Sequence, residues 1–136
     1  MCNLDCYDWN MFRISLILDA IHMWVLHPSN SMDKLKQILH LFNTQDPGKV
    51  PIHYAIAFLF IAEHHSVTYR EIEEELGSSN ASASWVVNGL GPYPRHRQYG
   101  YGWVETFIDP EEGRRYRVRL SAKGQAMYRD VERVMN

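Results

Sequence analysis

The chain has 136 residues, of which 46% are hydrophobic and 22% charged, a composition typical of one globular domain with a sizeable core rather than a disordered chain. Its formal net charge of −2 excludes a protein that is basic throughout. The charge is uneven, because residues 1–91 carry 5 Lys and Arg against 10 Asp and Glu, whereas residues 92–136 carry 9 against 6. A polyanion would therefore be attracted by local rather than by net charge.

The N-terminal region is apolar, but it fits neither a membrane span nor a secretion signal. Residues 11–26 include Arg13 and Asp19 and fall short of the ~20 apolar residues that a bilayer span needs. The acidic residues that precede them are wrong for a signal peptide. Cys2 and Cys6 have no further ligands at a metal-binding spacing, and free thiols suit a reducing cytoplasm. We expect a cytoplasmic protein with no membrane contact, metal or cofactor.

Three helices are predicted in the first half of the chain. Residues 10–26 have only a narrow polar stripe, so this helix is either central to the core or buried against another subunit, and we favour the subunit contact in part. Residues 32–43 show an apolar stripe at i, i+3, i+4 and i+7. Pro51 opens a third helix, where its missing N–H costs nothing. Its continuation, residues 52–62, is apolar on nearly all sides and is expected to be the central core helix.

A short helix with clear start and stop signals comes next. Thr68 and Glu71 form a capping box at the start of a helix over residues 69–76, and Val67 and Ile72 are placed to form a hydrophobic staple. Gly77 follows the helix, in the position where left-handed backbone is common. The acidic run 71–75 lies on this helix, and we expect it to be solvated and to point away from any DNA.

A second short helix over residues 80–90 is capped by Ser78 or Ser79. Its inward stripe is predicted to consist of Ala83, Val86, Val87 and Leu90. Two short helices joined by a glycine-containing turn are the helix-turn-helix pattern. Small and amide side chains at the start of the second helix suit close approach to a DNA major groove, although they also suit an ordinary solvated helix.

The last third of the chain predicts a ribbon and a final helix. Residues 115–120 alternate strictly between arginine and apolar residues, which is typical of a half-buried strand. Residues 109–113 supply a turn to a preceding strand that starts at Val104, with the proline fixing one φ and the glycine free to take a positive one. Ser121 caps a helix over residues 122–135.

Residues 68–124 resemble the multiple antibiotic resistance regulator (MarR) family of winged-helix transcription factors. The matching stretches are TYREIEEELG (68–77), SSNASASWVVNGL (78–90), GWVE (102–105), DPEEGRR (109–115) and LSAKG (120–124). The wing and the LSAKG ending are the specific part, and the likeness is closest to compact members associated with phage and prophage genomes. The resemblance implies a mostly α-helical winged helix-turn-helix with a small β-ribbon and additional N-terminal helices.

The resemblance also implies a function. The chain would be a transcriptional regulator, without enzymatic activity, that acts as a repressor. It would form a homodimer and bind double-stranded DNA in a bacterial or phage-infected cell. Residues 1–50 would dimerise, 51–124 would bind DNA and 125–136 would complete the final helix of one compact domain. The helix 80–90 would lie in the major groove, and the turn near 109–115 would touch the minor groove or backbone.

The candidate DNA contacts come from the recognition helix and its cap, the loop after it, and the wing. They are Ser79, Asn80, Ala81, Ser82, Ser84, Trp85, Asn88, Arg95, Arg97, Arg114, Arg115 and Arg117. Asp109 is expected to hold the wing turn. Trp85 is either exposed, for contact with thymine methyls or sugars, or turned into the core. Arg95, His96 and Arg97 either contact phosphates or belong to a solvated loop.

A second function class stays open. A winged helix can serve as a module that binds a host protein, such as RNA polymerase or a defence factor. The acidic N-terminal part and the uncharged recognition helix favour this alternative. The histidines are not spaced as metal ligands, and no catalytic set of side chains emerges.

Overall fold

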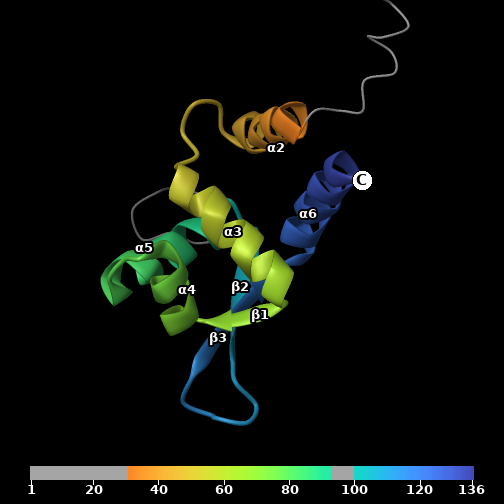
Figure 1. Cartoon of the computed structure of the whole chain (residues 1–136). Coiled ribbons are helices and arrows are strands. Elements are labelled where there is room, and N and C mark those ends of the chain that lie inside the picture. Colours follow the sequence, from red (N-terminus) through yellow and green to blue (C-terminus); the bar gives the residue numbers. More distant parts are fainter. Residues whose placement is uncertain (1–30, 93–99) are drawn as a thin grey trace, which may run out of the picture. The chain divides into compact units, whose positions relative to one another are not determined.

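The computed structural model describes residues 31–92 and 100–136 (Figure 1). The helices and strands are α2 (Ser31–Gln45), α3 (Ile52–His64), β1 (Ser66–Thr68), α4 (Tyr69–Leu76), α5 (Asn80–Leu90), β2 (Val104–Ile108), β3 (Tyr116–Leu120) and α6 (Ala122–Met135). The chain divides into two compact units, and the second, Lys36–Asn136, contains all of these elements except the start of α2. The five helices predicted from residue 32 onward are confirmed, whereas the predicted helix 10–26 lies outside the described residues.

The strands form one antiparallel sheet in the order β1-β3-β2. Val67 of β1 faces Val118 of β3, and Thr106 of β2 faces the same residue from the other side. The sequence pattern does not predict β1, because three residues are too few to show alternation. β2 and β3 continue past β1 into the wing loop (Figure 1). The sheet therefore joins the wing to the strand that leads directly into α4.

Helix α3 is the core helix, as predicted. It contacts α4, α5, β1, β3 and α6, and its buried side chains include Phe58 and Ile61. Trp103, fully buried, packs edge-on against Phe58 with ring centroids 5.4 Å apart. One face of α3 departs from the expectation, because Ile52 and Ile56 are 62% and 42% exposed. The core therefore uses only part of this apolar helix.

The predicted signals around the helix-turn-helix are present. The Thr68 amide donates to the Glu71 carboxylate at 2.6 Å, and the Glu71 amide donates to the Thr68 hydroxyl at 3.3 Å, which completes the capping box. Gly77 ends α4 with a φ of 55° in the left-handed region. Ser79, rather than Ser78, caps α5 by accepting from the Ser82 amide at 3.4 Å. The start of each helix is thus fixed by its own side chains.

The LSAKG segment ties α6 to the chain that leads into β2. The Ser121 hydroxyl donates to the Gly102 carbonyl at 2.6 Å, and the Lys123 ammonium donates to the Tyr101 carbonyl at 2.8 Å. Gly124 allows the closest approach, because a Cβ built there would overlap the Trp103 carbonyl oxygen and lie 2.9 Å from its carbonyl carbon. Ser121, Lys123 and Gly124 of this segment therefore hold the start of α6 against the chain before β2.

We predict that Gly124→Ala destabilises the fold by about 1–3 kcal/mol, because the added methyl must displace backbone rather than a flexible side chain. Gly113→Ala is the matched control, since its Cβ would meet nothing within 4 Å, and we expect a change of less than about 1 kcal/mol. Urea unfolding followed by tryptophan fluorescence measures both. Equal unfolding midpoints for the two variants would contradict this account of α6 docking.

Candidate nucleic-acid interface

Helix α5 has one buried face and one outward face. The predicted inward stripe is confirmed, with Ala83, Val86, Val87 and Leu90 all buried. Among the candidate contacts, Ser79, Asn80, Ala81, Ser82 and Trp85 are exposed, and Ser84 and Asn88 are half-buried. The outward surface therefore consists of the first turn of the helix and the indole one turn further on.

Of the two positions that the sequence left open for Trp85, exposed or turned into the core, the structure has the exposed one. Its side chain is 47% exposed, and its ring packs edge-on against Tyr54 with centroids 5.9 Å apart. Tyr54 is 1% exposed, and Gly89 leaves room for it, because a Cβ there would lie 2.6 Å from the tyrosine ring. The core helix α3 thus holds an aromatic surface at the outward side of α5.

A hollow of about 500 Å³ lies beside this indole. Ser78 contributes a buried hydroxyl oxygen that has no hydrogen-bond partner among the described residues. The side chains around it are mostly apolar, and they come from the start of α3, the end of α4, the turn after α4 and helix α5: His53, Leu76, Ser78, Ala81, Ser82, Trp85 and Val86. The recognition helix therefore borders an open, largely apolar depression rather than a flat surface.

One residue of the acidic run lies closer to α5 than expected. The Asn80 amide donates to the Glu73 carboxylate at 3.4 Å, so Glu73 does not point away from the candidate interface. Glu74 pairs with Arg70 on the surface of α4 at 3.1 Å, and Glu71 is engaged in the capping box. The expectation that the acidic face points away from the DNA-binding side is therefore wrong for Glu73, because the turn brings α4 against the start of α5.

Asp109 organises the wing turn, as the sequence suggests. It is 8% exposed, its carboxylate accepts from the Glu111 amide at 3.0 Å, and its amide donates to the Arg115 carbonyl at 2.8 Å. The hydrogen bond from Glu111 is the main cause that lowers the pKa of Asp109, and Arg117 lowers it further. Gly113 does not have the positive φ that the turn pattern suggested. The side chain of Asp109 therefore does more for this turn than the freedom of its glycine.

Arg117 is held within the fold. Its guanidinium donates to Asp109 at 3.3 Å, to the Ser66 hydroxyl at 3.2 Å and to the Ser66 carbonyl at 3.1 Å. It is 29% exposed. Arg117 therefore links the wing turn to β1, and its geometry makes it a positioning residue.

The remaining wing arginines differ in how they are paired. Arg119 pairs with Glu105 across the strands at 2.7 Å, and Arg115 pairs with Glu112 in the exposed turn at 3.2 Å. Residues 104–119 contain four arginines and four carboxylates, so the ribbon has no net charge. Arg114 is exposed and has no ion pair with any described residue. Arg114 is therefore the wing cation without an ion pair to a described residue, and Arg115 and Arg119 remain accessible because exposed pairs are weak. Of these, Arg114 and Arg115 lie at the wing turn.

The loop candidates Arg95 and Arg97, with His96, lie outside the described residues, so their two alternatives stay open. Within residues 31–92 and 100–136 there is no cluster of His, Cys, Asp or Glu side chains able to hold a metal ion. No helix in those same segments is long and apolar enough to cross a bilayer.

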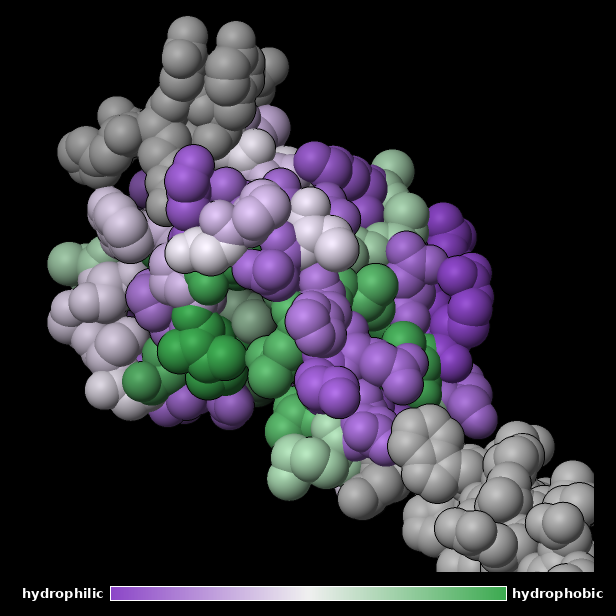
Figure 2. Space-filling model, turned by 90° about the horizontal axis from the view of Figure 1, so that it is seen from above, coloured by the Kyte–Doolittle hydropathy of each residue, from purple (hydrophilic) through white to green (hydrophobic). Residues whose placement is uncertain are grey.

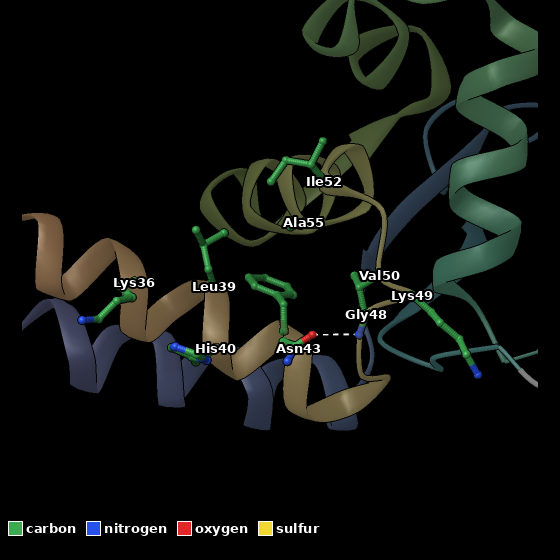
Figure 3. Close-up of a pocket in the computed structure, with 10 residues that line it drawn as sticks. Lys36, Leu39, His40, Asn43, Gly48, Lys49, Val50, Ile52 and Ala55 are labelled. Carbon is green, nitrogen blue, oxygen red and sulfur yellow. Dashed lines mark hydrogen bonds between the residues drawn. The ribbon is translucent and has the colours of Figure 1, made fainter.

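A second hollow, of about 420 Å³, lies between α2 and the start of α3 (Figure 3). Asn43 closes the loop beside it by accepting from the Gly48 amide at 2.8 Å. Leu39 and Ile52 line this hollow and are 43% and 62% exposed. Figure 2 shows hydrophobic side chains gathered among hydrophilic ones on the face seen from above. Apolar surface is therefore exposed away from the recognition helix as well as beside it.

Comparison with known proteins identifies the fold. No protein-family model and no curated protein sequence matches the chain. Among solved structures, a MarR-like transcriptional regulator from Thermotoga maritima is 22% identical, covers 98% of this chain and 77% of its own, and gives a TM-score of 0.56. A MepR variant from S. aureus bound to an oligodeoxyribonucleotide is 12% identical, with coverages of 90% and 75% and a TM-score of 0.59.

A third solved structure, FabT from Streptococcus pneumoniae in complex with DNA, is 18% identical, with coverages of 90% and 74% and a TM-score of 0.55. At these identities the likeness shows the fold. The chain is a winged helix-turn-helix of the kind found in MarR-type regulators, as the sequence predicts.

We predict that Asp109→Asn lowers the stability of the folded protein at neutral pH. Stability should also fall less steeply in acid for this variant than for the unaltered chain. The pKa of Asp109 is lowered in the folded protein, so its contribution is complete above the ordinary carboxyl pKa of ~3.9 and is lost as the pH falls through the lower, folded value. Thermal unfolding from pH 7 down to about pH 2, which covers the range below the ordinary carboxyl pKa, measures the difference between variant and unaltered chain.

Glu112→Gln is the control for Asp109→Asn, because it removes an exposed pair in the same turn. It should change stability by no more than about 0.5 kcal/mol at any pH. If Asp109→Asn and Glu112→Gln have the same pH dependence, the assignment of the turn to Asp109 fails.

Proposed function

We propose that the chain is a DNA-binding transcriptional regulator that acts as a homodimeric repressor and has no catalytic activity. The observation that carries the proposal is the outward surface of α5, where small, amide and aromatic side chains are exposed at the start of a well-capped helix. The solved structures of MepR and FabT with nucleic acid support the same use of this fold. The cytoplasmic location and the relation to phage proteins stay predictions.

In this proposal the start of α5 enters the major groove. Helix N-terminal amides attract phosphate, and short side chains let the backbone approach the bases. Asn80, Ala81 and Ser82 are all exposed there. Arg114 and Arg115 at the wing tip then contact the DNA backbone or minor groove, while Arg117 sets the position of the turn through Asp109.

We predict that Arg114→Ala and Arg115→Ala weaken binding to every duplex and make its salt dependence shallower, because each phosphate contact releases counterions. The slope of log affinity against log salt should fall by about one for each phosphate that the variant no longer neutralises. Fluorescence anisotropy with a random duplex at several salt concentrations provides the measurement.

Lys36→Ala provides the control, because this exposed cation lies on α2 and lines the other hollow. Its salt slope should match that of the unaltered chain. If both arginine variants bind random DNA with unchanged affinity and slope, the wing does not contact the DNA phosphate backbone. If the unaltered chain also shows no salt-dependent binding, the protein-binding alternative replaces the regulator.

Dimerisation belongs to the same proposal. The helix predicted to dimerise, residues 10–26, lies outside the described residues, but the described part of the chain exposes apolar side chains on α2 and α3. Leu39, Ile52 and Ile56 are 43%, 62% and 42% exposed. Ile52 and Ile56 are four residues apart and share one helix face. A second copy of the chain is the partner that we propose for this surface.

We predict that Ile56→Asp shifts the chain from dimer to monomer, because a carboxylate buried in an apolar interface loses its hydration. Ala81→Asp on the exposed face of α5 places the same charge at the DNA side and should leave the dimer intact. Sizing with light scattering at micromolar concentration distinguishes the two. A monomeric unaltered chain under these conditions would exclude the dimer.

A further inference from the structure

We propose that α5 recognises A·T base pairs, and that the exposed indole of Trp85 receives the 5-methyl group of thymine. This inference rests on the proposed function and adds to it the class of base pair that the helix selects. It follows from which side chains the outward surface of α5 has and which it lacks.

The helix lacks the side chains that most often select guanine. Arginine and lysine make the commonest specific contacts to the O6 and N7 atoms of guanine. Residues 80–90 contain neither. The described wing arginines are distributed between internal pairs and the tip of the turn, where Arg114 and Arg115 lie. Cations are therefore present at the wing tip for phosphates but absent from α5 itself.

The helix does offer an amide suited to adenine. Asparagine can form a bidentate pair with the N6 and N7 atoms of adenine in the major groove. Asn80 is exposed at the first position of α5. Its bond to Glu73 is long, at 3.4 Å, so adenine can replace it at little cost. Asn88 is half-buried, which makes Asn80 the better placed of the two.

The apolar part of the surface matches the partner base of adenine. Thymine is the only base with a methyl group in the major groove, and apolar side chains select it by contact. Ala81 and Trp85 are four residues apart on α5 and so are neighbours on one side of the helix. Both are exposed and both line the hollow beside the indole. A methyl group that enters this hollow leaves water for an apolar surface.

The indole is also held in place before any DNA arrives. Its edge-on contact with Tyr54 connects it to a side chain that is 1% exposed. A fixed aromatic surface loses little conformational freedom on binding. The geometry thus provides a preformed site for the thymine methyl, and Asn80 in the first turn of the same helix provides an amide for adenine.

The test begins with enrichment of binding sites from a random duplex pool by the unaltered full chain. The base pairs protected by α5 should be A·T. Replacing thymine by uracil at those positions removes only the methyl group and should lower affinity about fourfold for each methyl buried. Uracil at thymines outside the α5 footprint is the matched control and should have no effect.

Trp85→Ala identifies the residue responsible. This variant should bind thymine and uracil duplexes equally, and Trp85→Phe should restore part of the difference. Because the uracil comparison uses the unaltered chain, it decides the question even if Trp85→Ala does not fold.

Three results would overturn the inference and leave the proposed function intact: protected positions that are G·C, no loss of affinity with uracil, or a uracil effect of full size in folded Trp85→Ala. Failure to bind any duplex would instead overturn the proposed function itself.

Discussion

The pairing of β1 with β3 is the constraint on which the arrangement of the candidate interface depends. Thr68 is both the last residue of β1 and the N-cap of α4, so the strand that pairs with the wing continues directly into the helix-turn-helix. Arg117 reinforces this link from β3 through Ser66 and Asp109. A change at the wing turn therefore acts on the strand that positions α4. The wing and the helices are parts of one arrangement rather than independent modules.

A second constraint positions α5 from the inside. Tyr54 of α3 fills the space that Gly89 leaves open and supports the indole of Trp85 at the surface. The same tyrosine contacts Tyr101, which stacks on Trp103 with ring centroids 4.6 Å apart. The aromatic core thus extends continuously to the outward side of the recognition helix. Because protein interiors are close-packed, an interior substitution along this path is expected to shift the exposed indole as well.

Local signals made much of the fold predictable. The Thr68 and Glu71 capping box, Gly77 and the Ser121 cap each act within a few residues, so α4, α5 and α6 were predicted with the bounds that the structure has. β1 could not be predicted in this way, since its only evidence is its pairing with a strand about fifty residues later. A strand of three residues is recognised by its pairing with another strand, and the residues of β1 alone do not indicate which strand it pairs with or in which register.

The sequence predicted which residue types lie at the candidate site, but not which of their side chains form ion pairs and hydrogen bonds with one another. Strict alternation indicated an arginine face on β3, yet Arg117 and Arg119 are engaged by Asp109 and Glu105, which are supplied by the turn and by the neighbouring strand. Likewise, the acidic run gave no sign that Glu73 would meet Asn80. Such pairings depend on which side chains the folded backbone brings together. The exposure of Trp85 needed the structure for the same reason, because a tryptophan among apolar residues fits a core equally well.

The most direct test of the central claim is a map of the surface that changes when a duplex binds. Amide hydrogen exchange of the full chain, measured with and without excess duplex DNA, reports each segment separately. We expect slower exchange in both the first turn of α5 and the wing turn 109–115, with no change in the loop 46–50, whose Gly48 amide is already bonded to Asn43. Protection confined to α2 and α3, or an unchanged α5 despite tight binding, would contradict the central claim.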